Sequence, residues 1–298
     1  MSLRRVLFAT DLSAYARAVV DCLIGLREAG VREVVLLHVV DQGLSYVQDA
    51  AGFDVIGQLK LDAQRGLAEE SARLEERGFA VRTRLEVGVP AQRIVQVAEE
   101  EDASLIAVGA YGRTLLEEML LGSVAERVLH LARRPVLIER PRVLAGLGGA
   151  ECQRRGAKTF ARVLLPTDFS PPSAVAMRFV AGLRDAGLQE VVVLHVLEEG
   201  ELRGRRPQGV GRITRDAEAR LREIASTLGR GGVQARCRLE RGVPAATILR
   251  VADEEAVGSI VMGSRGRGMV MELLLGSVAE RVARQSAHPV VIVPARGA

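Results

Sequence analysis

The sequence predicts an α/β protein made of two repeated open-sheet domains, each a five-stranded parallel sheet with helices on both faces. Strand-like and helix-like segments alternate along each half without a hairpin signal. Such alternation, with right-handed crossovers, gives parallel sheets covered on both faces. The halves also repeat each other, since residues 122–128 recur letter for letter at 276–282. A chain of 298 residues has the length expected for two domains.

Hydrophobic periodicity places the elements of the first half in order. A short apolar stretch bounded by turn residues predicts a strand, and apolar residues three and four positions apart predict a helix. The expected strands are 6–10, 33–40, 80–87, 104–109 and 135–139, and the expected helices are 13–29, 56–77, 90–101 and 123–132. Strands and helices therefore alternate through the whole half.

The second half repeats these elements. Three segments recur in the same order, 6–13 at 163–170, 34–40 at 191–197, and 88–90 at 242–244. The weakly periodic segment between the repeats contains Gly146, Gly148, Gly149 and Gly156, which are typical of a linker. We therefore expect a first domain at 1–141, a linker at 142–160 and a second domain at 161–298.

Composition excludes several classes of protein. The chain is 48% hydrophobic and 26% charged, and it has no apolar run near the roughly 18 residues that span a bilayer. Asp11 interrupts the first apolar stretch, which argues against a signal peptide. Three cysteines without metal-ligand spacing are typical of a reducing cytoplasm. We expect a cytoplasmic protein without membrane contact.

Arginines gather in one segment of the second half, which is predicted to be a solvated loop. Aromatic residues do not interleave with these arginines, so nucleic-acid binding is not expected. The residues are Arg203, Arg205, Arg206, Arg212 and Arg215.

A glycine pattern, Gly-x2-Gly-x9-Gly-Ser, occurs at matching places in both halves. Glycine lets a ligand approach the backbone closely, and a Gly-Ser pair at the start of a helix directs free N–H groups toward an anion. The pattern predicts two phosphate-binding loops, with a nucleotide as the favoured ligand. Its members are Gly109, Gly112, Gly122 and Ser123 in the first half, and Gly263, Gly266, Gly276 and Ser277 in the second.

These motifs together resemble a tandem universal stress protein. The resemblance rests on a strand ending in Thr-Asp-x-Ser, a second ending in His-Val, the glycine pattern and a closing Pro-Val strand, each present twice. The glycine pattern is typical of the ATP-binding branch of that family. The resemblance implies an adenine nucleotide alpha-hydrolase-like fold with strand order 3-2-1-4-5.

In such a sheet the ligand crevice lies beyond the carboxyl ends of the strands, where the strand order reverses. The implied order puts this reversal between the first and fourth strands. Asp11 and Asp168 follow the first strands, and by resemblance they would lie near the base or ribose. Val40 and Leu197, or their neighbours, would line the adenine pocket.

Alternatives remain open at these positions. Asp11 and Asp168 could cap the following helix, a role compatible with ligand contact. The glycines could serve only as a strand end, a turn and a helix start. The second loop has Ser264 and Arg265 where the first has alanine and tyrosine. If one site binds more tightly, we therefore expect it to be the second.

The sequence argues against ordinary nucleotide chemistry. It contains no Gly-x4-Gly-Lys-Ser/Thr loop and no Gly-x-Gly-x-x-Gly after a first strand. His38 and His195 lie in apolar strands, which is typical of satisfied, partly buried histidines, and no metal-ligand spacing occurs. We expect a nucleotide-dependent stress-response regulator that binds ATP, ADP or AMP, with Mg²⁺ as a companion of the nucleotide, and at most weak ATPase activity.

Two other functions remain open. One is a slow Mg²⁺-dependent ATP hydrolase in which Asp11 or Asp168 organises the metal or water. The other is a nucleotide-free interaction module that uses the arginine segment. The apolar segments 135–138 and 289–293 predict edge strands that pair the domains as an intramolecular pseudo-dimer, as the resemblance also implies, and leave a further homodimer open. The sequence does not identify a protein partner.

Overall fold

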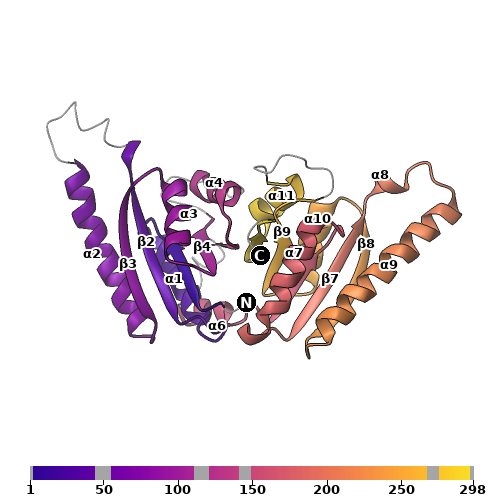
Figure 1. The fold of residues 1–298 in the computed structure, drawn as a ribbon, viewed down its shortest axis with the longest axis horizontal. Helices are drawn as coiled ribbons and strands as arrows, with labels where there is room; N and C mark the ends of the chain where they lie inside the picture. Colours follow the sequence, from indigo (N-terminus) through magenta and orange to yellow (C-terminus); the bar gives the residue numbers. More distant parts are fainter. Residues whose placement is uncertain (1–2, 44–54, 111–120, 141–148, 267–274, 296–298) are drawn as a thin grey trace. The chain divides into compact units, whose positions relative to one another are not determined.

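The computed structural model describes residues 3–43, 55–110, 121–140, 149–266 and 275–295 (Figure 1). The chain divides into two compact units, a first unit of Leu3–Ala157 and a second unit of Lys158–Ala298. No helix of the described ranges is both long and apolar enough to cross a membrane.

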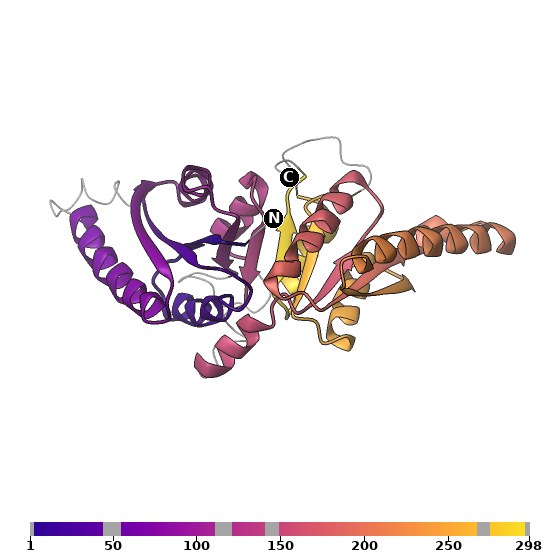
Figure 2. The ribbon, with the colours of Figure 1, turned by 60° about the horizontal axis from the view of Figure 1, so that its bottom comes forward.

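The first unit is a parallel α/β structure with strand order β3-β2-β1-β4-β5, the order expected from the resemblance. Helices α1 and α2 cover one face of the sheet, and α3 and α4 cover the other (Figure 2). The strands are β1 (Arg5–Ala9), β2 (Glu33–Asp41), β3 (Ala80–Gly88), β4 (Leu105–Gly109) and β5 (Val136–Glu139). The helices are α1 (Ala14–Gly25), α2 (Val55–Glu75), α3 (Pro90–Glu100) and α4 (Ser123–Leu131).

The second unit repeats this order as β8-β7-β6-β9-β10, again with parallel neighbours. Helices α7 and α9 correspond to α1 and α2, and α10 and α11 to α3 and α4. The strands are β6 (Arg162–Pro166), β7 (Glu190–Leu197), β8 (Gln234–Arg241), β9 (Ser259–Gly263) and β10 (Val290–Val293). The helices are α7 (Pro171–Ala181), the 3-10 helix η2 (Gly182–Ala186), α8 (Glu199–Leu202), α9 (Pro207–Gly229), α10 (Pro244–Glu254) and α11 (Ser277–Gln285).

The hydrophobic core of each unit lies between its sheet and the helices that cover both faces of that sheet. The central strands β1, β4, β6 and β9 are apolar almost throughout because helices bury both of their faces. The outer strands β3 and β8 instead carry exposed charged residues. Arg84 on β3 is paired with Glu101, and Arg238 on β8 is paired with Glu255. Such charges are typical of sheet edges that do not pair with another chain.

The segment expected to be a linker contains a helix, α6 (Gly149–Ala157), which belongs to the first unit and packs on α1. Only Cys152 and Gly156 of this helix are buried, so its sequence has no clear apolar stripe. The segment predicted to be a linker, 142–160, therefore contains a helix that its weak periodicity did not indicate. Residues 142–148 lie outside the described part of the chain.

The expectation of a loop at Arg203–Arg215 is also wrong in part. Helix α9 begins at Pro207, so Arg212 and Arg215 lie on its exposed side. Proline suits the first position of a helix because it has no N–H to leave unpaired. Ala217, Leu221 and Leu228 then hold the inner face of α9 in the core.

Candidate functional site

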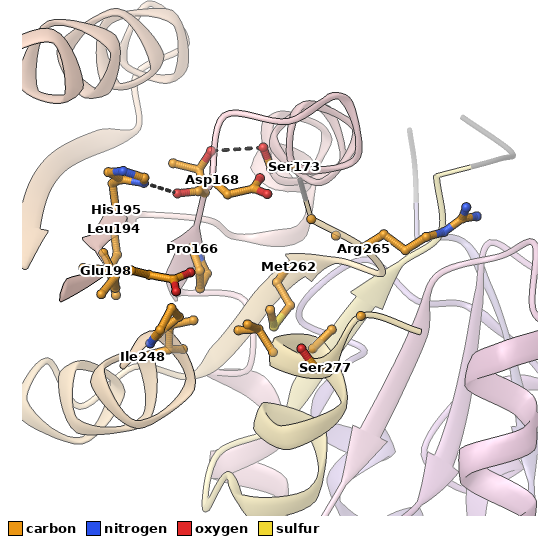
Figure 3. Close-up of a pocket in the computed structure, with 18 residues that line it drawn as sticks. Pro166, Asp168, Ser173, Leu194, His195, Glu198, Ile248, Met262, Arg265 and Ser277 are labelled. Carbon is orange, nitrogen blue, oxygen red and sulfur yellow. Dashed lines mark hydrogen bonds between the residues drawn. The ribbon is translucent and has the colours of Figure 1, made fainter. Parts of the chain in front are cut away.

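The second unit contains a cavity of about 310 Å³ beyond the carboxyl ends of β6 and β9 (Figure 3). The strand order reverses between these two strands, which is where open α/β sheets bind ligands. Polar and apolar groups share the wall. It is lined by Pro166, Thr167, Asp168, Ser173, Leu194, His195, Val196, Glu198, Pro244, Ile248, Met262, Gly263, Arg265, Gly266, Gly276, Ser277, Val278 and Ala279.

Asp168 is held in this cavity by the turn that follows β6. Its Oδ1 accepts hydrogen bonds from the backbone N–H and the hydroxyl of Ser170, at 3.0 and 2.5 Å. Its Oδ2 is directed toward the glycine loop, since a Cβ built on Gly266 would lie 2.7 Å from it. Phe169 has a left-handed backbone, with φ of 62°, which a non-glycine residue rarely adopts.

Ser170, rather than Asp168, is the N-cap of α7, and its side chain accepts a hydrogen bond from the N–H of Ser173. In the first unit Ser13 caps α1 in the same way. The alternative in which the aspartates cap these helices is therefore wrong. Each aspartate instead accepts the N–H of the capping serine, which leaves its second carboxylate oxygen directed elsewhere.

The opposite side of the cavity is the start of α11. Gly276, which has no side chain, is the N-cap, and the first intrahelical bond runs from the N–H of Glu280 to the carbonyl of Gly276, at 2.8 Å. Ser277, Val278 and Ala279, whose amides precede that bond in the helix, line the cavity. Such amides, together with the helix dipole, attract anions. This arrangement suits a phosphate group.

Each glycine of the second loop is required for a different physical reason. A Cβ on Gly263 would lie 2.8 Å from the carbonyl oxygen of Pro172, so glycine there lets β9 pack against α7. Among the described residues, a Cβ on Gly266 would meet the side chain of Asp168, inside the cavity. The N–H of Gly276 closes the loop on the carbonyl of Ser264 at 2.8 Å. Gly266 is thus the glycine whose absence of a side chain most directly keeps the cavity open.

The apolar side of the cavity is formed by Pro166, Val196, Ile248 and Met262. Leu197 is not among the lining residues because its side chain is buried in the core, whereas its neighbours Val196 and Glu198 reach the cavity. Side chains alternate along a strand, which explains the one-residue shift. Val40, its counterpart in the first unit, is likewise buried.

His195 fixes the local geometry. Its Nδ1 lies 2.7 Å from the carbonyl oxygen of Thr167, and its ring packs against Phe169 with centroids 4.4 Å apart. In the first unit His38 lies 2.8 Å from the carbonyl of Thr10. The prediction of satisfied histidines is confirmed, and these rings tie β7 to β6 and β2 to β1.

The first unit repeats the same turn. The N–H of Ser13 donates to Oδ1 of Asp11 at 3.0 Å, and Leu12 has a φ of 60°. Oδ2 of Asp11 is buried and has no hydrogen-bond partner among the described residues. Such an atom is costly unless a ligand or water donates to it.

The glycine loop of the first unit is described at both ends. Gly109 ends β4, and the N–H of Gly122 donates to the carbonyl of Ala110 at 2.8 Å. Helix α4 then begins at Ser123 with Gly122 as its N-cap. Gly112 lies outside the described residues, so its predicted role is not addressed by the structure.

Two residues of the cavity were not named by the sequence analysis, although Glu198 is one of the neighbours of Leu197 that it allowed for. Glu198 follows β7 directly and lines the cavity next to His195 (Figure 3). Pro244 begins α10 after Gly242, whose φ is 142°, and the repeated Gly-Val-Pro turn was the available signal for it. In Figure 3 the side chain of Arg265 extends away from Asp168 and Ile248. No group of His, Cys, Asp or Glu side chains within the described ranges could hold a metal ion.

Comparison with known proteins gives a consistent family. The profile of the universal stress protein family matches residues 2–140 and 159–294. Universal stress protein MJ0577 of Methanocaldococcus jannaschii is 30% identical over 151 residues, 45% of this chain and 93% of that protein. A universal stress protein of Mycolicibacterium smegmatis is 28% identical over 229 residues, 74% of this chain and 71% of that protein.

A solved structure matches at full length. The crystal structure of a universal stress protein from Archaeoglobus fulgidus has a TM-score of 0.75 and 28% identity to this chain. The match covers 99% of this chain and 100% of that one. The repeated α/β fold is therefore shared along both halves.

Proposed function

We propose that this chain, which belongs to the universal stress protein family, binds ATP or a related adenine nucleotide in the cavity of its second unit. The observation that carries the proposal is that the Asp168 carboxylate and the first amides of α11 face one cavity. A carboxylate accepts hydrogen bonds from hydroxyl or amino groups, and helix N-terminal amides bind phosphate. A nucleotide carries both kinds of group on one molecule.

The apolar wall supports the same ligand class. Pro166, Val196, Ile248 and Met262 offer flat apolar contact of the kind that a purine ring fills. The base would lie against these side chains, and the phosphates would lie along Gly266, Gly276 and Ser277. Mg²⁺ would accompany the phosphates as part of the nucleotide complex.

We extend the proposal to a second site in the first unit. The unpartnered Oδ2 of Asp11 and the N-terminus of α4 correspond to Asp168 and the N-terminus of α11. In the second unit Arg265 lines the cavity at the position where the first unit has tyrosine, whereas Ser264 is buried and does not line it. We therefore expect the second site to bind more tightly.

Binding, rather than turnover, is the proposed activity. The hydrogen bonds of Oδ1 of Asp168 to Ser170, and of Nδ1 of His195 to the carbonyl of Thr167, hold both side chains in fixed positions suited to ligand contact. A ligand at a hundred times its Kd stabilises the folded state by about 2.7 kcal/mol. We propose a stress-response regulator in which this stabilisation of the glycine loops is the signal, with at most slow hydrolysis.

The first test is to denature the purified protein and identify released nucleotides by chromatography and mass spectrometry. Close to two adenine nucleotides per chain would support two sites, and close to one would support a single tight site. If none is released, and ATP with Mg²⁺ does not raise the Tm, the proposal fails in favour of a nucleotide-free interaction module. A pseudo-dimer of the two units, a further homodimer and a cytoplasmic location remain predictions.

A further inference from the structure

Helix α6 packs unusually closely against α1. A Cβ built on Gly156 would lie 1.9 Å from the carbonyl oxygen of Cys22, and a Cβ on Gly25 would lie 2.2 Å from the carbonyl oxygen of Gln153. Both distances are far below a normal contact, so the two backbones touch where only glycine fits. Side chains that face each other beside this contact must therefore lie very close together.

Two of the protein's three cysteines occupy that position. Cys22 on α1 and Cys152 on α6 are each 1% exposed, and they form a small buried cluster with Ala18 beside it. Both are free thiols, and their side chains belong to the same buried cluster. Residues 22 and 152 lie on one face of their helices with Gly25 and Gly156, one turn away in each case. The third cysteine, Cys237, is exposed on β8 of the second unit.

We propose that Cys22 and Cys152 form a modification site, at which oxidation by hydrogen peroxide links α1 to α6 through a disulfide. The sulfur of Cys152 attacks one peroxide oxygen, the O–O bond breaks, and the thiol proton leaves with the departing hydroxide as water. The sulfur of Cys22 then attacks the sulfenic acid, the S–O bond breaks, and a second water carries away the Cys22 proton. Two thiols lose two electrons in total, and one peroxide gains them.

The pair is protected until α6 moves. Burial raises the pKa of both thiols, and that of Cys22 far more, so little reactive thiolate is present while α6 is docked. Cys152 is one of the two buried residues of α6 and faces α1, so peroxide reaches its sulfur when α6 separates from α1. Release exposes Cys152 first, and redocking brings its sulfenic acid back onto Cys22.

The disulfide has a defined structural effect. It closes a loop from α1 to α6 that includes nearly all of the first unit, and it fastens the segment leading into β6 and Asp168. A crosslink across so long a loop restricts the unfolded chain strongly. The oxidised protein should therefore have a higher Tm than the reduced protein.

The test uses the full-length Cys237→Ser variant, which keeps only the proposed pair. The folded, reduced protein is treated with hydrogen peroxide, denatured, alkylated and weighed by mass spectrometry. We expect both alkylation sites to disappear, the chain to stay monomeric on a non-reducing gel, a peptide pair containing residues 22 and 152, and full recovery of both thiols with dithiothreitol. Two persisting thiols, or a disulfide between chains, would overturn the proposal.

A matched control is the Cys22→Ser, Cys237→Ser double variant, in which Cys152 has no partner. It should stop at a sulfenic acid that a dimedone probe traps, whereas the Cys237→Ser variant should give little trapped product. Equal trapping in both variants would contradict resolution by Cys22. If either variant has an altered circular dichroism spectrum, the peptide pair is sought in the oxidised wild-type protein, and its absence there also overturns the proposal.

Discussion

The two units differ in the groove between their first two helices, which are α1 and α2 in the first unit and α7 and α9 in the second. The turn that follows the first strand of each unit, β1 or β6, is the same in both. In the first unit Arg73 on α2 is paired with Asp21 on α1 at 2.7 Å and with the buried Glu70 at 2.9 Å. In the second unit the corresponding positions 224 and 227 are isoleucine and threonine, and a cavity of about 240 Å³ lies between α7 and α9.

The crevice turn, by contrast, is kept in detail. The residue after each aspartate has a φ near 60°. Each histidine ring lies against the carbonyl oxygen of the threonine that precedes the aspartate. The two described ends of each glycine loop are joined by a 2.8 Å backbone hydrogen bond. A left-handed non-glycine residue costs free energy that the surrounding structure must offset. Its presence twice indicates that the turn is constrained as a whole, while the packing behind it could change after duplication.

The largest predicted effect concerns Glu139, whose counterpart in the second unit is Val293. Glu139 is buried at the end of β5, and burial raises its pKa from 4.5 to about 7. The folded state thus binds the proton more tightly, so Glu139 costs no stability below about pH 4.5, and its penalty grows as the pH rises to about 7. Above that pH the penalty is about 3 kcal/mol.

Glu139→Val, which copies the second unit, should therefore raise the Tm at pH 8 and have a smaller effect at pH 5. Thermal unfolding followed by circular dichroism at both pH values checks this. Val293→Ala is a control whose effect should not depend on pH. A Tm difference for Glu139→Val that is the same at both pH values would show that this carboxyl does not titrate as described.

Gly263 and Gly266 are predicted to respond differently to alanine. In Gly263→Ala the new Cβ meets the backbone of α7 at 2.8 Å, which should cost about 2 kcal/mol of stability. In Gly266→Ala the new Cβ meets, among the described residues, the Asp168 side chain, so the fold should be kept while ATP affinity falls about tenfold or more. Urea unfolding and calorimetric titration separate the effects. Equal losses of stability in both variants would contradict this division.

A smaller effect on stability is expected from the cluster of Arg73, Asp21 and Glu70 between α1 and α2. Arg73→Thr should leave the buried Glu70 without its partner and cost about 2 kcal/mol, less than for a fully buried pair because the arginine is partly exposed. Adding Glu70→Ile completes the pattern of the second unit and should restore most of the loss. If the double variant loses as much stability as the two single variants together, the ion cluster and the Ile-Thr pair are not two interchangeable ways of packing this groove.

The helix caps give the smallest effect. Ser13→Ala and Ser170→Ala each remove a side-chain acceptor from a helix start and should cost about 1 kcal/mol. Because Ser170 also donates its hydroxyl to Asp168, only Ser170→Ala should alter nucleotide affinity as well. If Ser13→Ala lowers nucleotide affinity at the first site as much as Ser170→Ala does at the second, the hydroxyl hydrogen bond to Asp168 does not contribute to binding.

The alternating elements, and the strand end and helix start that flank each glycine loop, could be predicted because their signals are local. Gly276 and Ser277, for example, stand at a helix start exactly where free amides are needed. Helix α6 could not be predicted, since only two of its residues face inward and its glycines resemble linker residues. The contacts of Gly263 with α7, and the direction of the Leu197 side chain, depend on packing between segments far apart in the sequence.

The aspartates were located correctly, but their partners were not. Sequence suggested a choice between helix cap and ligand contact for Asp11 and Asp168. The structure instead gives the cap to the serine two positions later, and in the first unit Oδ2 of Asp11 has no hydrogen-bond partner among the described residues. That division depends on the left-handed residue between them, which no periodicity reveals.

The most direct measurement is calorimetric titration of nucleotide-free protein with ATP and Mg²⁺, comparing the wild type with Asp11→Asn and Asp168→Asn. The account predicts two sites in the wild type, loss of the tighter one in Asp168→Asn and loss of the weaker one in Asp11→Asn, with the melting curves unchanged. Two unaltered sites in both variants would show that the nucleotide does not bind beside these carboxylates, and would contradict the assignment of the crevice.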